Sequence, residues 1–228
     1  PNASHAEELT ERLYQATVKP SLDFSSSQSR LFIIAASDDS IEGITTELIL
    51  PDDSTLVHTS GSQPLSLLQF AAAQNTGVFY PLQTFSKTKR VDFKTVPFFI
   101  EASDQEAERL LLTMGKAISQ KVKKISSEER KALHVAAVFA SNFPNHMLTL
   151  SKKVMSEHGL DFEWLKPLIS ETINKALTVG PEHAQTGPAI RNDLEVLDRH
   201  VEFLQNDERA AELYRVISQH IIDMYGSE

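Results

Sequence analysis

Residues 31–40 read LFIIAASDDS, six apolar residues followed directly by four small polar ones. A short, continuous apolar run of this kind is typical of a strand that is buried on both faces of a sheet. Ser37 and Asp38 then supply side chains that open a helix, because their oxygens accept backbone N–H groups of its first turn. The stretch therefore predicts a buried strand that leads straight into a helix, the repeating unit of a parallel α/β sheet.

The same alternation of strand and helix signals extends to residue 125. We expect strands over 31–36, 55–58, 77–80, 98–101 and 117–125, and helices over 41–48, 65–73 and 104–114 between them. Strands that alternate with helices predict a mostly parallel sheet. Ligands of such sheets bind outside the carboxyl ends of the strands, so we expect a site at that edge.

The pattern changes at Ser126, which forms the sequence signature of a capping box with Glu129. Beyond it, the spacing of the apolar residues predicts helices alone, over 127–157, 161–178, 187–205 and 207–225. Pro144 should kink the first of these helices. We therefore expect an α/β domain over residues 1–125 and an all-α domain over residues 126–228.

The composition is that of a globular protein, with 41% hydrophobic and 23% charged residues. No apolar run approaches the roughly 18 residues that a membrane span requires. The net charge of −9 argues against a nucleic acid as partner, because no basic tract offsets it. Cysteine is absent, and Pro1–His5 have neither the basic start nor the apolar segment of a signal peptide. We therefore expect a cytoplasmic protein that binds neither nucleic acid nor membrane.

Two kinds of site are missing from the sequence. The eight glycines are too widely spaced for a G-x-G-x-x-G phosphate loop or a Walker loop. The eight histidines show neither H-x-x-x-H nor H-E-x-x-H spacing, so we expect no metal site.

A polar stripe interrupts the apolar helix over residues 133–146, LHVAAVFASNFPNH. Several of its polar residues fall near one helical face, because residues three, four and seven apart stack along a helix. Either a ligand in a cleft or a dimer interface would supply the hydrogen bonds that such a stripe needs. Histidine suits proton transfer near neutral pH, and asparagine polarises a carbonyl or imine. The candidates are His134, Asn142 and His146 for catalysis, and Ser141 and Asn145 for substrate binding.

Two further segments carry candidate polar groups. Residues 185–191, QTGPAIR, are typical of a helix start with Thr186 as the cap, where Arg191 could hold a carboxylate or phosphate. The alternative is a plain capped helix in which Arg191 pairs with a neighbouring acid. Lys175 lies four residues after Glu171, a spacing that gives either a surface ion pair or a catalytic group.

Seven segments together resemble the bacterial family in which a Rossmann-like domain precedes a DUF2520 domain. They are SDD (37–39), HTSGS (58–62), FYPLQTFS (79–86), FFIEA (98–102), LHVAAVFASNFPNH (133–146), LISETINKA (168–176) and AQTGPAIRND (184–193). The family is distantly similar to pyrroline-5-carboxylate reductase and to the β-hydroxyacid dehydrogenases. The resemblance implies an oxidoreductase that uses NADP, NAD or F420 on a small carbonyl, imine or hydroxy acid. It also implies a homodimer formed through the C-terminal helices, with substrate bound between the domains.

The resemblance further implies that the turns after two strands run beside the cofactor. The residues so implied are Ala36, Ser37, Asp38, Thr59 and Ser60, and Lys175 falls where relatives approach the cleft. Two departures limit the chemistry that can be carried over. The lysine that β-hydroxyacid dehydrogenases place four residues before an asparagine is Val138 here, and Tyr80-Pro81 replaces the His-Pro turn of prephenate-type dehydrogenases.

The largest departure is at the N-terminus. Members of the family begin with a strand, a G-x-G-N turn, a helix and a second strand, a unit of roughly 35 residues that this sequence lacks. We expect that the chain is a piece of a longer protein, and that its strand over 31–36 lacks a neighbouring strand. The alternative is a protein that has lost the pyrophosphate-binding turn and serves as a non-catalytic, ligand-binding or regulatory homodimer.

Overall fold

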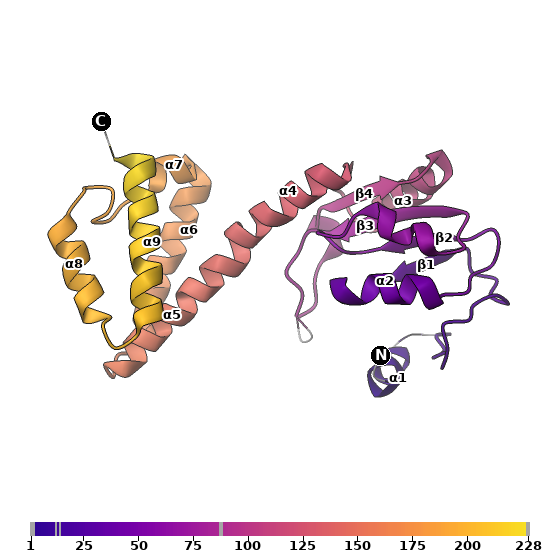
Figure 1. The fold of residues 1–228 in the computed structure, drawn as a ribbon, viewed down its shortest axis with the longest axis horizontal. Coiled ribbons are helices and arrows are strands. Elements are labelled where there is room, and N and C mark those ends of the chain that lie inside the picture. The colour runs from indigo at the N-terminus through magenta and orange to yellow at the C-terminus, as the bar shows by residue number, and fades with distance from the viewer. Residues whose placement is uncertain (1–2, 12, 14, 87–88, 227–228) are drawn as a thin grey trace. The chain divides into compact units, whose positions relative to one another are not determined.

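The computed structural model describes residues 3–11, 13, 15–86 and 89–226. The chain divides into two compact units, Pro1–Phe143 and Pro144–Glu228. The first unit contains a five-stranded sheet, whereas the described part of the second unit contains helices and no strand (Figure 1). The α/β region followed by an all-α region is therefore confirmed as the fold class. The domain boundary expected after residue 125 stays a prediction, and by packing the helix that begins at Ser127 belongs to the first unit.

The first unit alternates strands and helices along the chain. In order, its elements are α1 (Ala3–Thr10), β1 (Leu31–Ile34), α2 (Asp38–Glu47), β2 (Thr55–His58), the 3₁₀ helix η1 (Leu65–Phe70), β3 (Asn75–Pro81), the 3₁₀ helix η2 (Phe93–Thr95), β4 (Phe98–Ala102), α3 (Gln105–Ile118), β5 (Val122–Lys124) and α4 (Ser127–Ala137). The strand order is β1-β2-β3-β4-β5. All neighbouring pairs are parallel except β3 and β4, which are antiparallel, so the prediction of a mostly parallel sheet is confirmed.

The sheet carries a hydrophobic core on each face. Leu56 and Val57 are consecutive residues of β2 and point to opposite faces, because side chains alternate along a strand. Leu56 packs with Ile41 of α2 and with η1, whereas Val57 packs with Leu111 of α3. All four residues of β2 are buried, whereas Ile33 of β1 is 48% exposed, so burial on both faces holds for β2 and not for β1.

The predicted capping box at the start of α4 is confirmed. The backbone N–H of Glu129 donates to the hydroxyl of Ser126 at 3.2 Å, and the Ser126 N–H donates to the Glu129 carboxylate at 2.8 Å. The helix then passes into a π-helical turn, η3 (Val138–Asn142), in place of the kink expected at Pro144. The N–H of Phe143 donates to the carbonyl of Val138, five residues back. Single π-turns of this kind often mark functional sites.

The described part of the second unit consists of helices joined by loops. Its elements are α5 (Phe143–Glu157), which begins at the last residue of the first unit, the 3₁₀ helix η4 (Phe162–Leu165), α6 (Lys166–Val179), α7 (Pro181–Ala184), α8 (Leu194–Phe203) and α9 (Glu208–Tyr225). No helix in the described ranges is long and apolar enough to cross a membrane.

Several element boundaries differ from the sequence predictions, two of them widely. The helix expected over 187–205 begins only at Leu194, where the Asp193 side chain accepts the Val196 N–H. Gly187 and Asn192 have φ angles of 113° and 53°, which break any helix in between, so Thr186 is not a helix cap. The strand expected over 117–125 is reduced to β5, because residues 117 and 118 complete α3.

Candidate functional site

The loops that follow β1 and β2 meet at one edge of the sheet. The hydroxyl of Ser62 donates to Asp38 Oδ2 at 2.5 Å, which ties the start of α2 to the loop after β2. Parallel strands bring their carboxyl ends to the same edge, and this is where open α/β sheets bind ligands. Two of the segments proposed from the sequence are thus in direct contact.

The loop after β2 is held by its own side chains. The Ser60 hydroxyl accepts the N–H groups of Ser62 and Gln63 at 3.1 and 3.0 Å, and the Ser60 N–H donates to His58 Nδ1 at 3.1 Å. His58 and Ser60 are buried. Ser60 therefore shapes the loop in addition to any contact that it makes with a cofactor.

A tyrosine and a histidine from distant parts of the chain meet beside this loop. Tyr80, near the end of β3, lies with its hydroxyl oxygen 3.1 Å from Nδ1 of His134 on α4. Tyr80 is buried and His134 is half-buried. Gly61 approaches both side chains so closely that a Cβ at this position would lie 2.5 Å from His134 Nδ1 and 2.7 Å from Tyr80 Cζ. Only glycine fits at residue 61 without displacing the pair.

A buried arginine links the loop, α4 and β4. Arg130 is 1% exposed, and its Nη1 donates to the carbonyls of Ser60, Gly61 and Gln63 at 3.1, 3.3 and 2.7 Å. Its Nη2 donates to the Glu101 carboxylate at 3.0 Å and to the hydroxyl of Ser127 at 3.2 Å. A buried charge with this many partners fixes the loop backbone relative to the sheet.

Burial shifts the proton equilibria of two groups in this region. Burial, with a smaller contribution from the Arg130 charge, lowers the pKa of His58 to about 4. Burial raises the pKa of Tyr80, although the Arg130 charge partly opposes this. At neutral pH, His58 is therefore uncharged and Tyr80 keeps its hydroxyl proton.

The other proposed residues of the first unit lie in more open surroundings. Thr59 is half-buried, and Asp38 is half-buried beside Ser62. Exposed side chains belong to Ala36 and Ser37 after β1, and to Ser141 and Asn142 in η3. Contact of any of these residues with a cofactor or substrate stays a prediction.

The second unit holds the remaining proposed residues. Asn145 and His146 are exposed on α5, Lys175 is half-buried on α6, and Thr186 and Arg191 are exposed in the segment before α8. Among the described residues, Lys175 forms no ion pair with Glu171. Their roles in catalysis and substrate binding likewise stay predictions.

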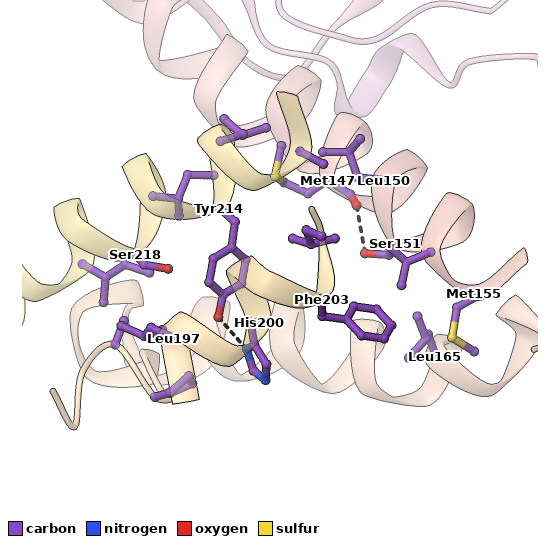
Figure 2. Close-up of a pocket in the computed structure, with 18 of the residues that line it drawn as sticks. Met147, Leu150, Ser151, Met155, Leu165, Leu197, His200, Phe203, Tyr214 and Ser218 are labelled. Carbon is purple, nitrogen blue, oxygen red and sulfur yellow. Dashed lines mark hydrogen bonds between the residues drawn. The ribbon is translucent and has the colours of Figure 1, made fainter. Parts of the chain in front are cut away.

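The second unit also contains an apolar pocket of about 540 Å³, lined chiefly by α5, α8 and α9 (Figure 2). Thr186 is one of its lining residues. The polar groups that line it include His200, whose Nδ1 lies 2.7 Å from the hydroxyl of Tyr214. The Ser151 hydroxyl is already satisfied, because it donates to the carbonyl of Met147.

Three residues that organise the candidate site, Tyr80, Arg130 and Glu101, were not predicted from the sequence. Tyr80 replaces the histidine of the His-Pro turn of prephenate-type dehydrogenases, so the resemblance assigns it no role. One signal was present: Arg130 lies four residues before His134, so it continues the polar stripe of the helix by one turn.

Comparisons with known proteins identify the family. No curated protein matches the chain. Residues 96–221 match the family described as "Domain of unknown function (DUF2520)". Protein BF3122 of Bacteroides fragilis, named as a candidate NADP oxidoreductase, is 37% identical, with 95% of this chain and 84% of that one covered and a TM-score of 0.85.

Two further solved structures share the fold. Protein TM1727 of Thermotoga maritima is 24% identical, with 87% of this chain and 80% of that one covered and a TM-score of 0.72. A reductive aminase of Aspergillus terreus, solved with NADPH and ethyl levulinate, is 14% identical, with coverages of 96% and 81% and a TM-score of 0.68. The Rossmann-like α/β fold with a helical C-terminal region is thereby established. With more than half of its length matched by the family, this chain belongs to the DUF2520 family.

Proposed function

We propose that this protein is an NAD(P)-dependent oxidoreductase acting on a small carbonyl, imine or hydroxy acid. The observation that carries the proposal is the meeting of the loops after β1 and β2 with the Tyr80–His134 pair. The family relative named as a candidate NADP oxidoreductase supports the same reaction class.

The residues at this edge fit the nicotinamide end of a dinucleotide. The loops carry small side chains and hydroxyls, and the Asp38–Ser62 hydrogen bond holds them together. The residues that would hold the group are Ala36, Ser37, Asp38, Thr59 and Ser60. The sequence contains no glycine-rich turn for the pyrophosphate. When bound, a nicotinamide supplies or accepts the hydride.

The Tyr80–His134 pair suits the proton transfer that must accompany hydride transfer. Because burial raises the pKa of Tyr80, its hydroxyl stays protonated and shares a hydrogen bond with His134 Nδ1. In the tautomer in which Tyr80 donates to Nδ1, the imidazole proton lies on Nε2, the ring nitrogen that remains for a substrate oxygen or nitrogen. Asn142 would orient the substrate.

Nicotinamide binding provides the direct test. We expect NADPH or NADH to give a saturable change in nicotinamide fluorescence, and Thr59→Val to weaken it roughly three- to tenfold through the loss of one hydrogen bond. Thr113→Val, which removes an exposed hydroxyl on α3, is the matched control and should bind as the wild type does. If neither nucleotide gives a saturable change, the redox function is wrong and a non-catalytic ligand-binding protein becomes the better account.

We further propose that the protein is a homodimer through its C-terminal helices. Within residues 144–226, the buried apolar side chains are Ala189, Leu197 and Ala211, a small core for so many helical residues. Neither α5 nor α6 buries a single residue. Large apolar side chains of this unit are instead exposed, among them Trp164 of η4 at 67% and Leu177 of α6 at 82%. Such surface is typical of a subunit interface.

A charge on α6 should dissociate the dimer. We expect Leu177→Asp to weaken association roughly a hundredfold, because the carboxylate would be desolvated in the interface. Asn174→Asp adds the same charge at an exposed polar position of the same helix and is the control. Sedimentation equilibrium measures the mass, and the fluorescence of Trp164, the one tryptophan of the sequence, reports its burial. A wild-type protein that is monomeric at micromolar concentration would overturn this proposal.

A further inference from the structure

We infer that Arg130 is a positioning residue for the Tyr80–His134 pair and acts through the loop of residues 60–63. The purpose of this arrangement rests on the proposed oxidoreductase function. The geometry itself is a property of the chain and can be tested without a substrate.

The two terminal nitrogens of Arg130 divide their hydrogen bonds between two parts of the fold. Nη1 donates to three carbonyls of one loop, those of Ser60, Gly61 and Gln63. Nη2 donates to Glu101 on β4. A lysine has one nitrogen and lacks the planar fork, so it could not hold both partners in this geometry. The guanidinium therefore fixes the loop against the sheet in a way that a positive charge alone would not.

The held loop is the one that packs against the proton-transfer pair. A Cβ on Gly61 would lie 2.5 Å from His134 Nδ1 and 2.7 Å from Tyr80 Cζ, so the backbone of residue 61 has no spare room. The carbonyl of Gly61 is itself one of the acceptors of Arg130. Any shift of the loop would therefore change the space in which Tyr80 and His134 hydrogen-bond.

Arg130 also positions α4, the helix that carries His134. It lies four residues before His134 on α4, so the two side chains share one helical face. By binding both the loop and β4 from α4, the guanidinium sets the distance between the helix that carries His134 and the strands beside it. The Tyr80–His134 distance thus depends on a residue that hydrogen-bonds to neither ring.

The test is the ¹⁵N NMR signal of His134 Nδ1 in protein labelled at histidine. Tyr80→Phe provides the signal of a His134 that has lost its hydroxyl partner. We expect Arg130→Lys to move the Nδ1 signal most of the way to the Tyr80→Phe value. Glu101→Gln keeps Arg130 but weakens its hold on β4, and it should move the signal in the same direction by less. If Arg130→Lys does not fold, the Glu101→Gln variant tests the inference in its place.

A control separates positioning from loss of stability. Leu111→Ala removes core packing from the face of the sheet opposite to Tyr80, since Phe79 packs with Leu111 and successive side chains alternate. It should lower the melting temperature and leave the His134 signal unchanged. Folded Arg130→Lys and Glu101→Gln proteins with a wild-type His134 signal would overturn the inference, as would a shift of equal size in Leu111→Ala.

The same variants distinguish this inference from the proposed function. If wild-type protein binds no nicotinamide nucleotide while the His134 signal responds as expected, the redox function fails and the positioning role of Arg130 holds. If the wild type does bind NADPH or NADH, Arg130→Lys should bind it at least tenfold more weakly, because the loop that carries Thr59 and Ser60 is displaced.

Discussion

Arg130→Met should destabilise the protein by about 3–5 kcal/mol, because removing one member of a buried ion pair leaves the other charge without a partner. Glu101 is then a largely buried carboxylate whose remaining partner among the described residues is the Ser127 hydroxyl. The carbonyls of Ser60, Gly61 and Gln63 lose a charged donor at the same time. Methionine fills much of the volume of the arginine stem, so the loss reports polar contacts rather than a cavity.

Urea unfolding followed by circular dichroism at neutral pH measures this effect. Arg109→Met, which removes an exposed arginine from α3, is the matched control and should change the free energy of unfolding by less than about 0.5 kcal/mol. If Arg130→Met lowers the free energy of unfolding by less than about 1 kcal/mol, Arg130 is not the main residue that holds the loop in place.

The double variant Arg130→Met with Glu101→Leu refines this expectation. Removing both charges leaves no unpaired carboxylate, and replacing a buried pair by apolar groups is often close to neutral. We therefore expect part of the lost stability to return. The stability that the double variant does not recover comes from the three loop carbonyls, because they still lack the hydrogen bonds that Arg130 donates.

The local pattern of the sequence was sufficient for the strands and for most helices of this chain. The strand within the apolar run at 31–36 and the helix start at Ser126 can each be predicted from a few adjacent residues, since burial and capping act over a short stretch of chain. The reversed direction of β4 was not foreseen, because strand direction depends on the connection and on the partner strand. The helix start assigned to Thr186 was wrong because Gly187 and Asn192 adopt positive φ angles, which the sequence suggests but does not require.

The candidate site was only partly predictable, for a related reason. His134 and Asp38 were found because each stands out from its immediate neighbours. Arg130 and Tyr80 take their roles mainly from partners 29 to 70 residues away in the chain, so no local pattern identifies them. A polar residue on the same face as a recognised stripe, such as Arg130 before His134, is the kind of signal that deserves more weight in a related sequence.

Acid should destabilise the protein through the protonation of His58. His58 is 0% exposed and burial, aided by the Arg130 charge, lowers its pKa to about 4, although Glu101 and Asp38 oppose the shift. In the unfolded chain the pKa returns to about 6.5, so the unfolded state binds more protons between these two values. Stability is therefore fully present above pH 6.5, falls as the pH is lowered towards 4, and loses no more from this group below that.

The size of this effect follows from the difference between the two pKa values. A lowering to about 4 corresponds to a total of about 3 kcal/mol, of which about 2 kcal/mol should be lost between pH 7 and pH 4.5. Hydrogen bonds from Ser126 lower the pKa of Glu129, so this carboxylate begins to cost stability only as the pH approaches 4.5, its ordinary value in the unfolded chain. The window above pH 4.5 therefore reports His58 with little contribution from such groups.

Urea unfolding of wild type and His58→Gln at pH 7 and pH 4.5 isolates the contribution. The glutamine cannot be protonated in this range, so its free energy of unfolding should change by about 2 kcal/mol less than that of the wild type. His220→Gln, at an exposed position of α9, should follow the wild type. Protonation of His58 Nδ1 would remove the acceptor of the Ser60 N–H, so acid should also loosen the loop that Arg130 holds. If the free energy of unfolding falls by the same amount between pH 7 and pH 4.5 in wild type and in His58→Gln, protonation of His58 costs no stability. The side chain would then not be buried as the structure has it.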